Sequence, residues 1–328
     1  MDLKLSIIII THNRLELLKK CLESISLSIL PLKYEIIVII NGNDEHTLNF
    51  FQTFPFPKIN FKFYPIDKSS NGTARNEGIK QAQGEILYFL DDDVMVKEDT
   101  FSQVISKFDY YHDVDIIGGP NITPIDSKLF QRCSGQALAS LFGAANMQYK
   151  WAAIGQDRLT DDRALILCNL AARKRMFDRT KVNFNGHLTC AEENLLIQEL
   201  KLKGHKILYC PQLAVYHERR KSLKELAQQI FKYGKGRAQL TLYLPRSLPL
   251  LNVLPSIFVL YVMSLMLFPN SVYVLPFLLY LVIDLLFSVY LSVIQKSAIA
   301  FPIFFILFPV EHVSYGLGFL YGVFVKHR

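Results

Sequence analysis

The sequence contains few cysteines, and their spacing fits neither a disulfide framework nor a zinc site. Five cysteines are scattered over 328 residues, and none belongs to a Cys-x-x-Cys pair. An odd number of widely spaced cysteines is typical of thiols that stay reduced in an intracellular core. We therefore predict free cysteines and exclude the class of small secreted domains held together by disulfides.

The N-terminus also lacks an export signal. Its first ten residues, MDLKLSIIII, include an apolar run that is too short for a signal peptide and leads straight into a strand-and-turn pattern. We therefore expect the N-terminal part of the protein to stay in the cytosol.

Charge is missing from one long stretch near the C-terminus. No charged residue occurs between Ser247 and Ile283, a length well beyond the roughly 20 apolar residues that cross a bilayer. Apolar stretches follow one another at 249–268, 272–294 and 298–325. We predict transmembrane or membrane-associated helices over residues 247–328, with kinks at their prolines and with Pro309 able to divide the last stretch.

The number of membrane spans stays open. Three full spans would place the basic residues 326–328 outside, against the tendency of positive charge to remain on the cytosolic side. Two spans, or a re-entrant segment, would keep them inside. Asp284, Glu311 and His312 interrupt the apolar tail, where ionisable groups are costly. They could pair with one another, contact a lipid phosphate or lie near the membrane interface.

Positive charge is gathered in clusters. The formal net charge is +7. Basic residues concentrate at 173–175, 219–221 and 232–237. Such clusters suit nucleic acid, an anionic membrane surface or phosphorylated substrates, and the neighbouring apolar tail favours the last two. Residues 221–246 mix apolar and basic side chains, and Gly234 and Gly236 interrupt them. We predict an amphipathic segment at the membrane interface, with a helix packed on the domain as the alternative.

The first 220 residues carry the pattern of an α/β domain, in which apolar runs alternate with helix patterns. Strands are expected at 5–10, 35–40, 61–64, 86–90 and 206–209, and helices at 15–27, 71–83 and 192–203. This alternation predicts a mostly parallel central sheet with crossover helices. Polar residues follow three of the strand ends, at 11–14, 41–44 and 91–93. We expect them on one rim of the sheet, where such folds bind ligands.

Three adjacent carboxylates, Asp91, Asp92 and Asp93, follow the fourth of these strands. Like charges this close repel one another, so a positive group should compensate them. Carboxylate oxygens beside a strand end suit Mg²⁺ or Mn²⁺, which usually bridges to substrate phosphates. A solvated acidic turn is the alternative.

Five segments, in this order, resemble family 2 glycosyltransferases with the GT-A fold. They are SIIIITHNR, EIIVIINGN, NGTARNEGI, GEILYFLDDD and AEENLLIQELKLKGHKILYCPQLAVYH, and the resemblance covers about residues 4–217. It implies a nucleotide-diphospho-sugar donor, a divalent metal (Mn²⁺ or Mg²⁺) and inversion at the anomeric carbon. A GT-A domain of residues 1–220 would then precede the amphipathic segment and the membrane helices.

The resemblance also assigns donor and metal residues. Asp93 and Asp91 match the outer positions of the family's DxD motif: Asp93 would bind the metal directly, and Asp91 would hold the ribose or a metal-bound water. Asp92 fills the middle position beside the donor and is expected to be solvated. His217 matches a histidine that can join the metal, with a structural histidine as the alternative. The other matching donor positions are Thr11, His12, Asn13, Arg14, Asn71, Arg75 and Asn76.

The contacts to the base and the sugar are less settled. Many family members carry an aspartate that contacts the base just before the Asn-Gly of the second strand, and this chain has Ile40 there. Asn41 or Asp44 could replace that contact, or the nucleotide could be held mainly through its diphosphate. Asn169 lies in a segment that resembles the family's sugar-binding region, and it could bond a sugar hydroxyl or form a turn.

A second acidic pair, Glu192 and Glu193, matches the family's Glu-Asp pair. Inverting transfer needs a general base for the acceptor hydroxyl and positive charge for the departing diphosphate. The chemistry therefore requires one acidic site that holds metal and one that does not. We predict Glu193 as the base, with Glu192 contacting the acceptor or orienting the loop. For at least one of the two glutamates the alternative is a structural role, in which its negative charge at the start of a helix is favoured by the helix dipole.

We therefore predict a membrane-attached inverting glycosyltransferase that acts at the cytosolic face of the inner cell membrane. Its acceptor would be a lipid-linked sugar or a surface glycan, and its partners would include membrane lipids but no nucleic acid. Direct transfer to polyprenyl phosphate is an alternative within the class. The alternative from another class is a catalytically inactive nucleotide-binding domain on a membrane scaffold or transporter.

Overall fold

The computed structural model describes residues 3–30, 33–53, 61–188, 190–245, 248–267 and 270–325. The chain forms two compact units, and each is described by itself. The first comprises Met1–Ile122 with Ala152–His217, and the second comprises Thr123–Trp151 with Glu218–Arg328. The second unit thus takes in residues 123–151, which no sequence signal had set apart from the catalytic domain.

The first unit is built on an eight-stranded sheet with the order β3-β2-β1-β4-β9-β6-β10-β8. Its strands are β1 (Leu5–Thr11), β2 (Tyr34–Asn41), β3 (Phe61–Ile66), β4 (Ile86–Asp91), β6 (Val114–Gly118), β8 (Arg158–Leu159), β9 (Asn169–Arg173) and β10 (Lys206–Tyr209). β3, β2, β1 and β4 run parallel, as do β6 and β10, whereas β9 runs antiparallel to both of its neighbours. The predicted α/β fold with a mostly parallel sheet is confirmed, and each predicted strand is found.

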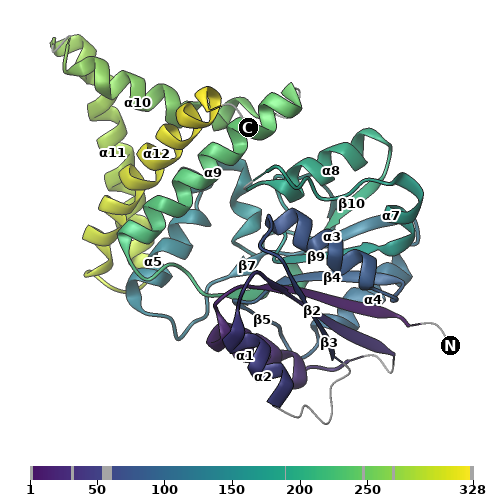
Figure 1. Cartoon of the computed structure of the whole chain (residues 1–328). Helices are drawn as coiled ribbons and strands as arrows, with labels where there is room; N and C mark the ends of the chain where they lie inside the picture. The colour runs from purple at the N-terminus through teal and green to yellow at the C-terminus, as the bar shows by residue number, and fades with distance from the viewer. Residues whose placement is uncertain are drawn as a thin grey trace. The chain divides into compact units, whose positions relative to one another are not determined.

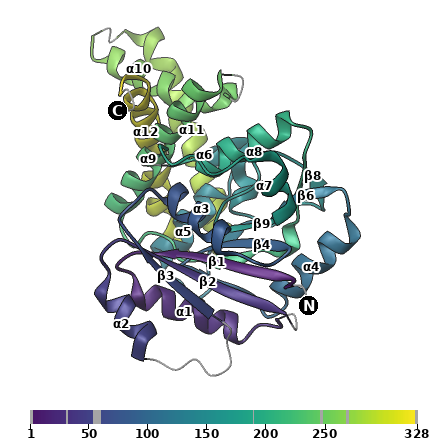
Figure 2. The ribbon, with the colours of Figure 1, turned by 45° about the vertical axis from the view of Figure 1, so that its right-hand side comes forward.

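Helices cover both faces of this sheet, which explains why its central strands are apolar without alternation. They are α1 (Leu15–Ser26), α2 (Glu45–Thr53), α3 (Asn71–Gln81), α4 (Thr100–Tyr110), α7 (Lys174–Thr180) and α8 (Glu192–Leu202). Ile7 and Ile9 pack in one core with Leu18 of α1 and Phe101 of α4. Ile8 points to the other face, where Gly78 of α3 lies against it. Figure 2 shows α1 and α2 on one side of β1 to β3, with α3 and α7 on the other.

A small second sheet with the order β5-β11-β7 sits beyond the end of β4. Its strands are β5 (Val94–Met95), β7 (Asn121–Ile122) and β11 (Val215–His217). β11 pairs with β5 so that His217 lies opposite Val94, next to the three aspartates. All five cysteines are free, and four of them are buried, as the sequence predicts.

The second unit is helical in its described residues. It contains α5 (Leu129–Leu138), α6 (Leu141–Ala144), α9 (Leu223–Tyr243), α10 (Leu254–Leu265), α11 (Ser271–Ile294) and α12 (Ala300–Phe324). α9 and α12 lie side by side (Figures 1 and 2). A Cβ atom at Gly234 would lie 2.8 Å from the backbone nitrogen of Phe319, and one at Gly322 would lie 2.7 Å from the carbonyl oxygen of Lys235. Glycines therefore let these two backbones approach closely.

Two expectations about helix breaks were wrong. Gly234 and Gly236 do not interrupt the amphipathic segment, because α9 is continuous through both, and Gly234 lies against the backbone of α12. Pro309 does not divide the last apolar stretch, because α12 continues through it. A long apolar helix tolerates one proline when neighbouring groups compensate the lost hydrogen bond.

Two helices are long and apolar enough to cross a membrane, Val272–Ile294 and Ala300–Phe324. The preceding apolar helix, Leu250–Leu265, is shorter than a span. Asp284 and Glu311 lie near the middle of the two long helices, with side chains buried inside the unit. His312 is bonded to the hydroxyl of Tyr280 at 3.0 Å and to the carbonyl oxygen of Phe142 at 2.9 Å.

Candidate active site

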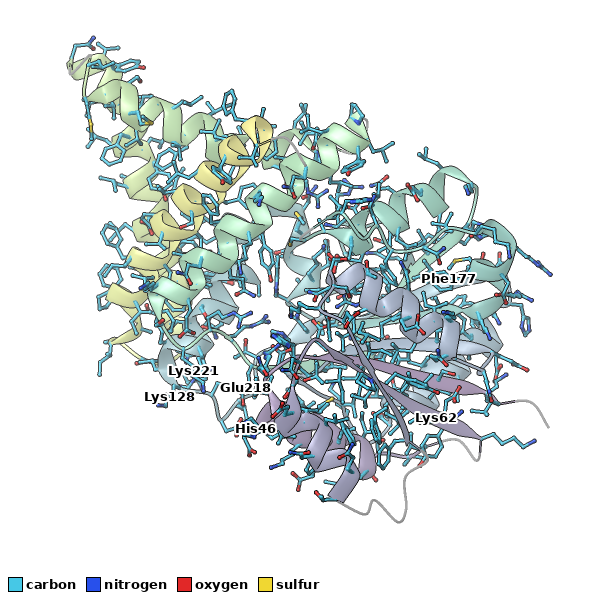
Figure 3. All side chains as sticks on the ribbon, in the orientation of Figure 1. His46, Lys62, Lys128, Phe177, Glu218 and Lys221 are labelled. Atoms are coloured by element: carbon cyan, nitrogen blue, oxygen red, sulfur yellow. The ribbon has the colours of Figure 1, made fainter. Side chains whose placement is uncertain are left out.

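The polar residues that follow β1, β2 and β4 share one edge of the large sheet. Thr11, Asn41 and Asp91 each end one of these parallel strands. Figure 3 illustrates the two ends of the sheet: His46, at the start of α2, lies at this edge, and Lys62 of β3 lies toward the opposite one. The rim expected from the sequence is therefore present.

Asp92 is buried, although it was expected to be solvated. Its carboxylate accepts a hydrogen bond from Thr11 Oγ1 at 2.8 Å and pairs with Arg14 Nη1 at 2.7 Å. Its exposed fraction is 2%. Burial, with a contribution from the charge of Asp93, raises the pKa of Asp92 to about 7, while Arg14 opposes that rise. The prediction failed because the loop after β1 folds over the loop after β4, which no local pattern indicates.

Asp93 and His217 are brought together, as the predicted metal site requires. His217 Nε2 lies 3.2 Å from Asp93 Oδ1, and Arg14 Nη2 pairs with Asp93 Oδ2. Burial alone would raise the pKa of Asp93, but the charges and hydrogen bonds of His217 and Arg14 outweigh it and lower that pKa. Within the described residues, the buried Asp93 Oδ1 has His217 Nε2 as its one close partner, and His217 Nδ1 is a buried nitrogen that makes no hydrogen bond.

Arg75 connects the two acidic groups. From α3, its guanidinium reaches Asp91 Oδ1 at 2.8 Å with one nitrogen and Glu192 Oε1 at 2.7 Å with the other. The Arg75 side chain is 6% exposed, and its pair with Glu192 lies inside the protein, whereas the Asp91 side chain is 35% exposed. Burial raises the pKa of Glu192, and the charge of Arg75 opposes that shift. The structure thus brings two carboxylates that are 101 positions apart in sequence, Asp91 and Glu192, onto one arginine.

Glu193 differs from its neighbour. Ala191 adopts a left-handed conformation with φ of 68°, and α8 begins directly after it. Glu192 is buried against Arg75, whereas Glu193 is partly exposed and makes no side-chain hydrogen bond or ion pair with any described residue. Of the two glutamates, Glu193 is therefore the one with a carboxylate available to a ligand.

Asn76 holds a backbone segment rather than facing an open space. Its side chain donates to the carbonyl oxygen of Phe184 at 2.8 Å and accepts from the backbone nitrogen of Phe184 at 2.9 Å. Arg75 lies over the Phe184 ring at 6.0 Å. A Cβ atom at Gly72 would lie only 2.6 Å from the carbonyl oxygen of Asn185. The start of α3, where Asn71 is exposed, therefore fastens the segment that leads to Glu192.

Asn169 is also fully engaged. Its side chain accepts from the Tyr88 hydroxyl at 2.5 Å and donates to the carbonyl oxygens of Pro120 at 3.2 Å and Leu213 at 2.6 Å. The residue has no exposed surface. Contact with a sugar would require these bonds to break, so the contacts in hand are those of a structural residue.

The loop after β1 is shaped by its own backbone. Asn13 has a positive φ of 53°, and its backbone nitrogen donates to Asp44 Oδ2 at 2.6 Å. This turn carries Arg14 toward Asp92 and Asp93, and it sets His12 beside Gly42. Lys68, which no sequence motif singles out, packs its side chain against the same glycine.

The residues present fit a divalent cation in their chemistry. Carboxylates and an imidazole are suitable ligands for Mn²⁺ or Mg²⁺. Asp93 supplies a buried oxygen that lies 3.2 Å from His217 Nε2, and Asp91 supplies a partly exposed carboxylate. Among the described residues, no group of three or more His, Cys, Asp or Glu side chains is arranged around one point. Such a cation would therefore need oxygens from substrate phosphates and water as well.

Comparison with known proteins agrees with this geometry. Residues 6–181 match the model of glycosyl transferase family 2. Glycosyltransferase AglE of Haloferax volcanii is 26% identical over 237 residues, which are 71% of this chain and 73% of AglE. Poly(ribitol-phosphate) β-N-acetylglucosaminyltransferase TarS of Staphylococcus aureus is 26% identical over 113 residues, which are 34% of this chain and 20% of TarS.

A solved structure shares the fold over nearly the whole chain. It is the mannosyltransferase PcManGT from Pyrobaculum calidifontis, in complex with GDP-Man and Mn²⁺. Its TM-score is 0.61 at 13% sequence identity, covering 99% of this chain and 88% of that one. With the family match over more than half of its length, the chain belongs to glycosyl transferase family 2 and is a glycosyltransferase with a GT-A-like fold.

Proposed function

We propose that this protein is a membrane-attached inverting glycosyltransferase that uses a nucleotide-diphospho-sugar and a divalent metal. The observation that carries the proposal is the double ion pair of Arg75, with Asp91 at 2.8 Å and Glu192 at 2.7 Å. This pairing brings the acidic cluster that contains Asp91, which suits a metal and a diphosphate, close to the cluster that contains Glu192, which suits proton transfer. An inverting displacement needs both at one centre.

Asp93, Asp91 and His217 would hold the metal. A bound divalent cation would neutralise the negative charge that develops on the departing diphosphate. Arg14 pairs with both Asp92 and Asp93 in this structure, so its guanidinium already compensates the charge of these carboxylates. We assign it the same electrostatic role toward the donor phosphates.

Glu193 is assigned as the general base. It would take the proton of the acceptor hydroxyl while that oxygen forms a bond to the anomeric carbon. The bond from this carbon to the diphosphate breaks on the opposite face, and its electron pair leaves with the diphosphate. The ion pair between Glu192 and Arg75 fixes the start of α8 and so positions Glu193. Glu192 is itself too buried to accept the proton of the acceptor hydroxyl.

The membrane attachment rests on α11 and α12. Both are long enough to span a bilayer, and both expose large apolar side chains. An enzyme so attached would act on acceptors confined to the membrane, and we assign it a lipid-linked or surface-glycan acceptor at the cytosolic face of the inner membrane. TarS is named a poly(ribitol-phosphate) β-N-acetylglucosaminyltransferase, and this name specifies a polymeric, phosphate-containing acceptor.

The test is a screen of nucleotide sugars with the full-length protein in detergent, with Mn²⁺ or Mg²⁺, that reads binding and nucleotide release. We expect one donor to bind only with metal and to be transferred to a membrane extract. Glu193→Gln should keep donor binding and lose transfer, while Glu16→Gln, an exposed residue of α1, should change neither. A protein that binds no nucleotide sugar, or that transfers normally without Glu193, would contradict the proposal.

Analysis of the product separates the remaining alternatives. A sugar linked directly to polyprenyl phosphate would assign the acceptor within the same class. Tight donor binding without any turnover, in every membrane extract tried, would favour an inactive nucleotide-binding domain on a membrane scaffold.

A further inference from the structure

Helix α9 runs alongside α12 in the same direction. Gly318 of α12 lies against the backbone of Phe231, and Gly322 lies against the carbonyl oxygen of Lys235. Both helices advance by four residues between these two contacts, so they run parallel. Further back, the first turns of α9 share a core with Leu307. α9 therefore accompanies α12 from Leu307 to Gly322, which is most of the length of α12.

The exposed side of α9 is polar. From the start of the helix to Lys235, its exposed residues are Lys224, Glu225, Gln228 and Lys232. Exposed apolar side chains come at the end of the helix, at Leu242 and Tyr243. If α12 crossed a bilayer, the charged side chains beside it would lie at the depth of the hydrocarbon, where they are unfavourable. The pair of α9 and α12 therefore suits the surface of a membrane and not its interior.

Helix α10 starts on α12 and is too short to carry the chain across a bilayer. Near its start, Ser256 donates to the carbonyl oxygen of Gly316 at 3.3 Å. The 12 residues of α10 extend about 18 Å, against about 30 Å of hydrocarbon. The first turn of α11 is fixed to α10, because Tyr261 donates to the carbonyl oxygen of Tyr273 at 2.7 Å and Ser264 bonds the Tyr273 hydroxyl at 2.5 Å. α11 therefore begins within the length of α10 from α12.

The other end of α11 returns to α12. Leu291, in the last turn of α11, shares a core with Ala300 and Phe304 at the start of α12. The exposed Lys296 lies in the short connection between the two helices. The chain thus leaves α12 along α10 and comes back to it along α11. If α12 lies on the membrane surface, both ends of this excursion lie on the same surface.

The hairpin formed by α10 and α11 is apolar on its outside. Its side chains that are at least half exposed include Leu254, Ile257, Leu260, Met263, Leu275, Leu279, Val282 and Leu286. Figure 1 shows the joined ends of α10 and α11 projecting away from α9. An apolar surface of this extent suits lipid acyl chains. The hairpin is therefore the part of the second unit that can enter the hydrocarbon.

We propose that the second unit enters one leaflet of the membrane and does not cross it. α9 and α12 lie along the cytosolic surface, where the lysines of α9 meet anionic lipid headgroups. The hairpin of α10 and α11 dips into the acyl chains and returns to the same side. This inference rests on the membrane attachment in the proposed function and specifies how that attachment is made.

The test is labelling of single introduced cysteines with a thiol reagent that cannot cross membranes. The full-length protein is labelled in sealed vesicles of both orientations, and the unsubstituted protein gives the background of the five natural cysteines, four of which are buried. Lys296→Cys should react from the cytosolic face alone. Met266→Cys, at the 84% exposed tip of the hairpin, should react in detergent but from neither face of the vesicles. Leu267→Cys repeats the measurement if the first variant folds poorly.

A depth measurement gives the tip a positive signal. A fluorophore attached to Met266→Cys in detergent is reconstituted into phosphatidylglycerol and phosphatidylethanolamine vesicles. Lipids with a nitroxide on the acyl chain should quench it more strongly than lipids with a nitroxide on the headgroup. Lys232→Cys, on the exposed side of α9, is the matched control, and its fluorophore should show the reverse order.

The outcomes separate this inference from the proposed function. Reaction of Met266→Cys or Lys296→Cys from the outer face would identify α11 as a membrane span and overturn the inference alone. Stronger quenching of the tip by headgroup nitroxides would also overturn it, because the hairpin would then lie outside the hydrocarbon. A protein that is not recovered with the vesicles would overturn the proposed membrane attachment as well.

Discussion

The two ends of the large sheet each hold buried carboxylates, and they are treated differently. At the amino end of β2, Glu35 accepts from Ser6 Oγ at 2.7 Å, from the backbone nitrogen of Gln83 at 2.7 Å and from Lys62 Nζ at 2.9 Å. At the carboxyl end of β4, Asp93 Oδ1 is also buried, but its one close partner among the described residues is His217 Nε2 at 3.2 Å. The first carboxylate is saturated by the fold, whereas one oxygen of the second is approached only by a histidine that is itself a candidate metal ligand.

The degree to which hydrogen bonds saturate a carboxylate distinguishes a structural role from a functional one better than its burial does. A saturated buried carboxylate stabilises the fold, because each of its oxygens has a donor. An unsaturated one is unfavourable for folding and is retained where a ligand completes it. Substitutions at the two ends should therefore have opposite signatures: activity should fall at one end and stability at the other.

The largest effect is expected at Glu193. Glu193→Gln removes the proposed base but no observed contact, so kcat should fall by about 10²–10⁴ while the melting temperature and donor affinity stay unchanged. Steady-state kinetics and calorimetry on the same preparation measure both. A matching loss in Glu16→Gln would show that the effect is not specific to the site.

A smaller but still large loss is expected at Asp93. Asp93→Asn removes the negative charge and replaces one carboxylate oxygen with an NH₂ group that cannot bind metal, so turnover should fall by about 10²–10³ and nucleotide affinity should no longer depend on Mn²⁺. Titration with and without a chelator measures the dependence. Metal-dependent binding that survives the substitution would place the metal elsewhere.

Asn76 should give an intermediate effect. Asn76→Asp keeps the acceptor for the Phe184 nitrogen but sets a carboxylate oxygen against the Phe184 carbonyl. The segment that leads to Glu192 should loosen, so kcat should fall about tenfold or more with little change in the KM for the donor. An equal rise in that KM would instead indicate direct contact with the donor.

The opposite end of the sheet should affect stability alone. Glu35→Gln replaces the charged partner of Lys62 and should lower the free energy of unfolding by about 1–3 kcal/mol at pH 7, with normal turnover per folded molecule. Equilibrium denaturation at several pH values measures the change. Lost turnover with unchanged stability would reverse the proposed difference between the two ends.

The pH dependence sharpens this case. Burial alone would raise the pKa of Glu35, but the hydrogen bonds from Gln83, Ser6 and Lys62 outweigh it, and the net effect lowers that pKa. The carboxylate therefore contributes stability above its unfolded pKa, and this contribution is lost as the pH falls through the folded pKa. The Gln variant should lose less stability than the wild type on acidification below about pH 4.5.

The acidic groups could be found from the sequence because they sit next to regular elements. Asp91 to Asp93 follow an unbroken apolar strand, and Glu192 and Glu193 begin a helix. What the sequence could not give is the partner of each residue. Asn41 and Asp44 seemed free to read a base, but Ser69 and Thr47 engage them through the backbone. Asp92 seemed solvated, but Thr11 covers it.

The sequence by itself determined the strands, the helices and the two acidic groups, because apolar periodicity and charge are local properties of the chain. Only the tertiary structure decided which side chains remain available. Arg75 meets Glu192 across 117 positions, and Arg14 meets Asp93 across 79. Hydrogen bonds form between neighbours in space, so the fold chose which carboxylates are saturated and which are left for a ligand.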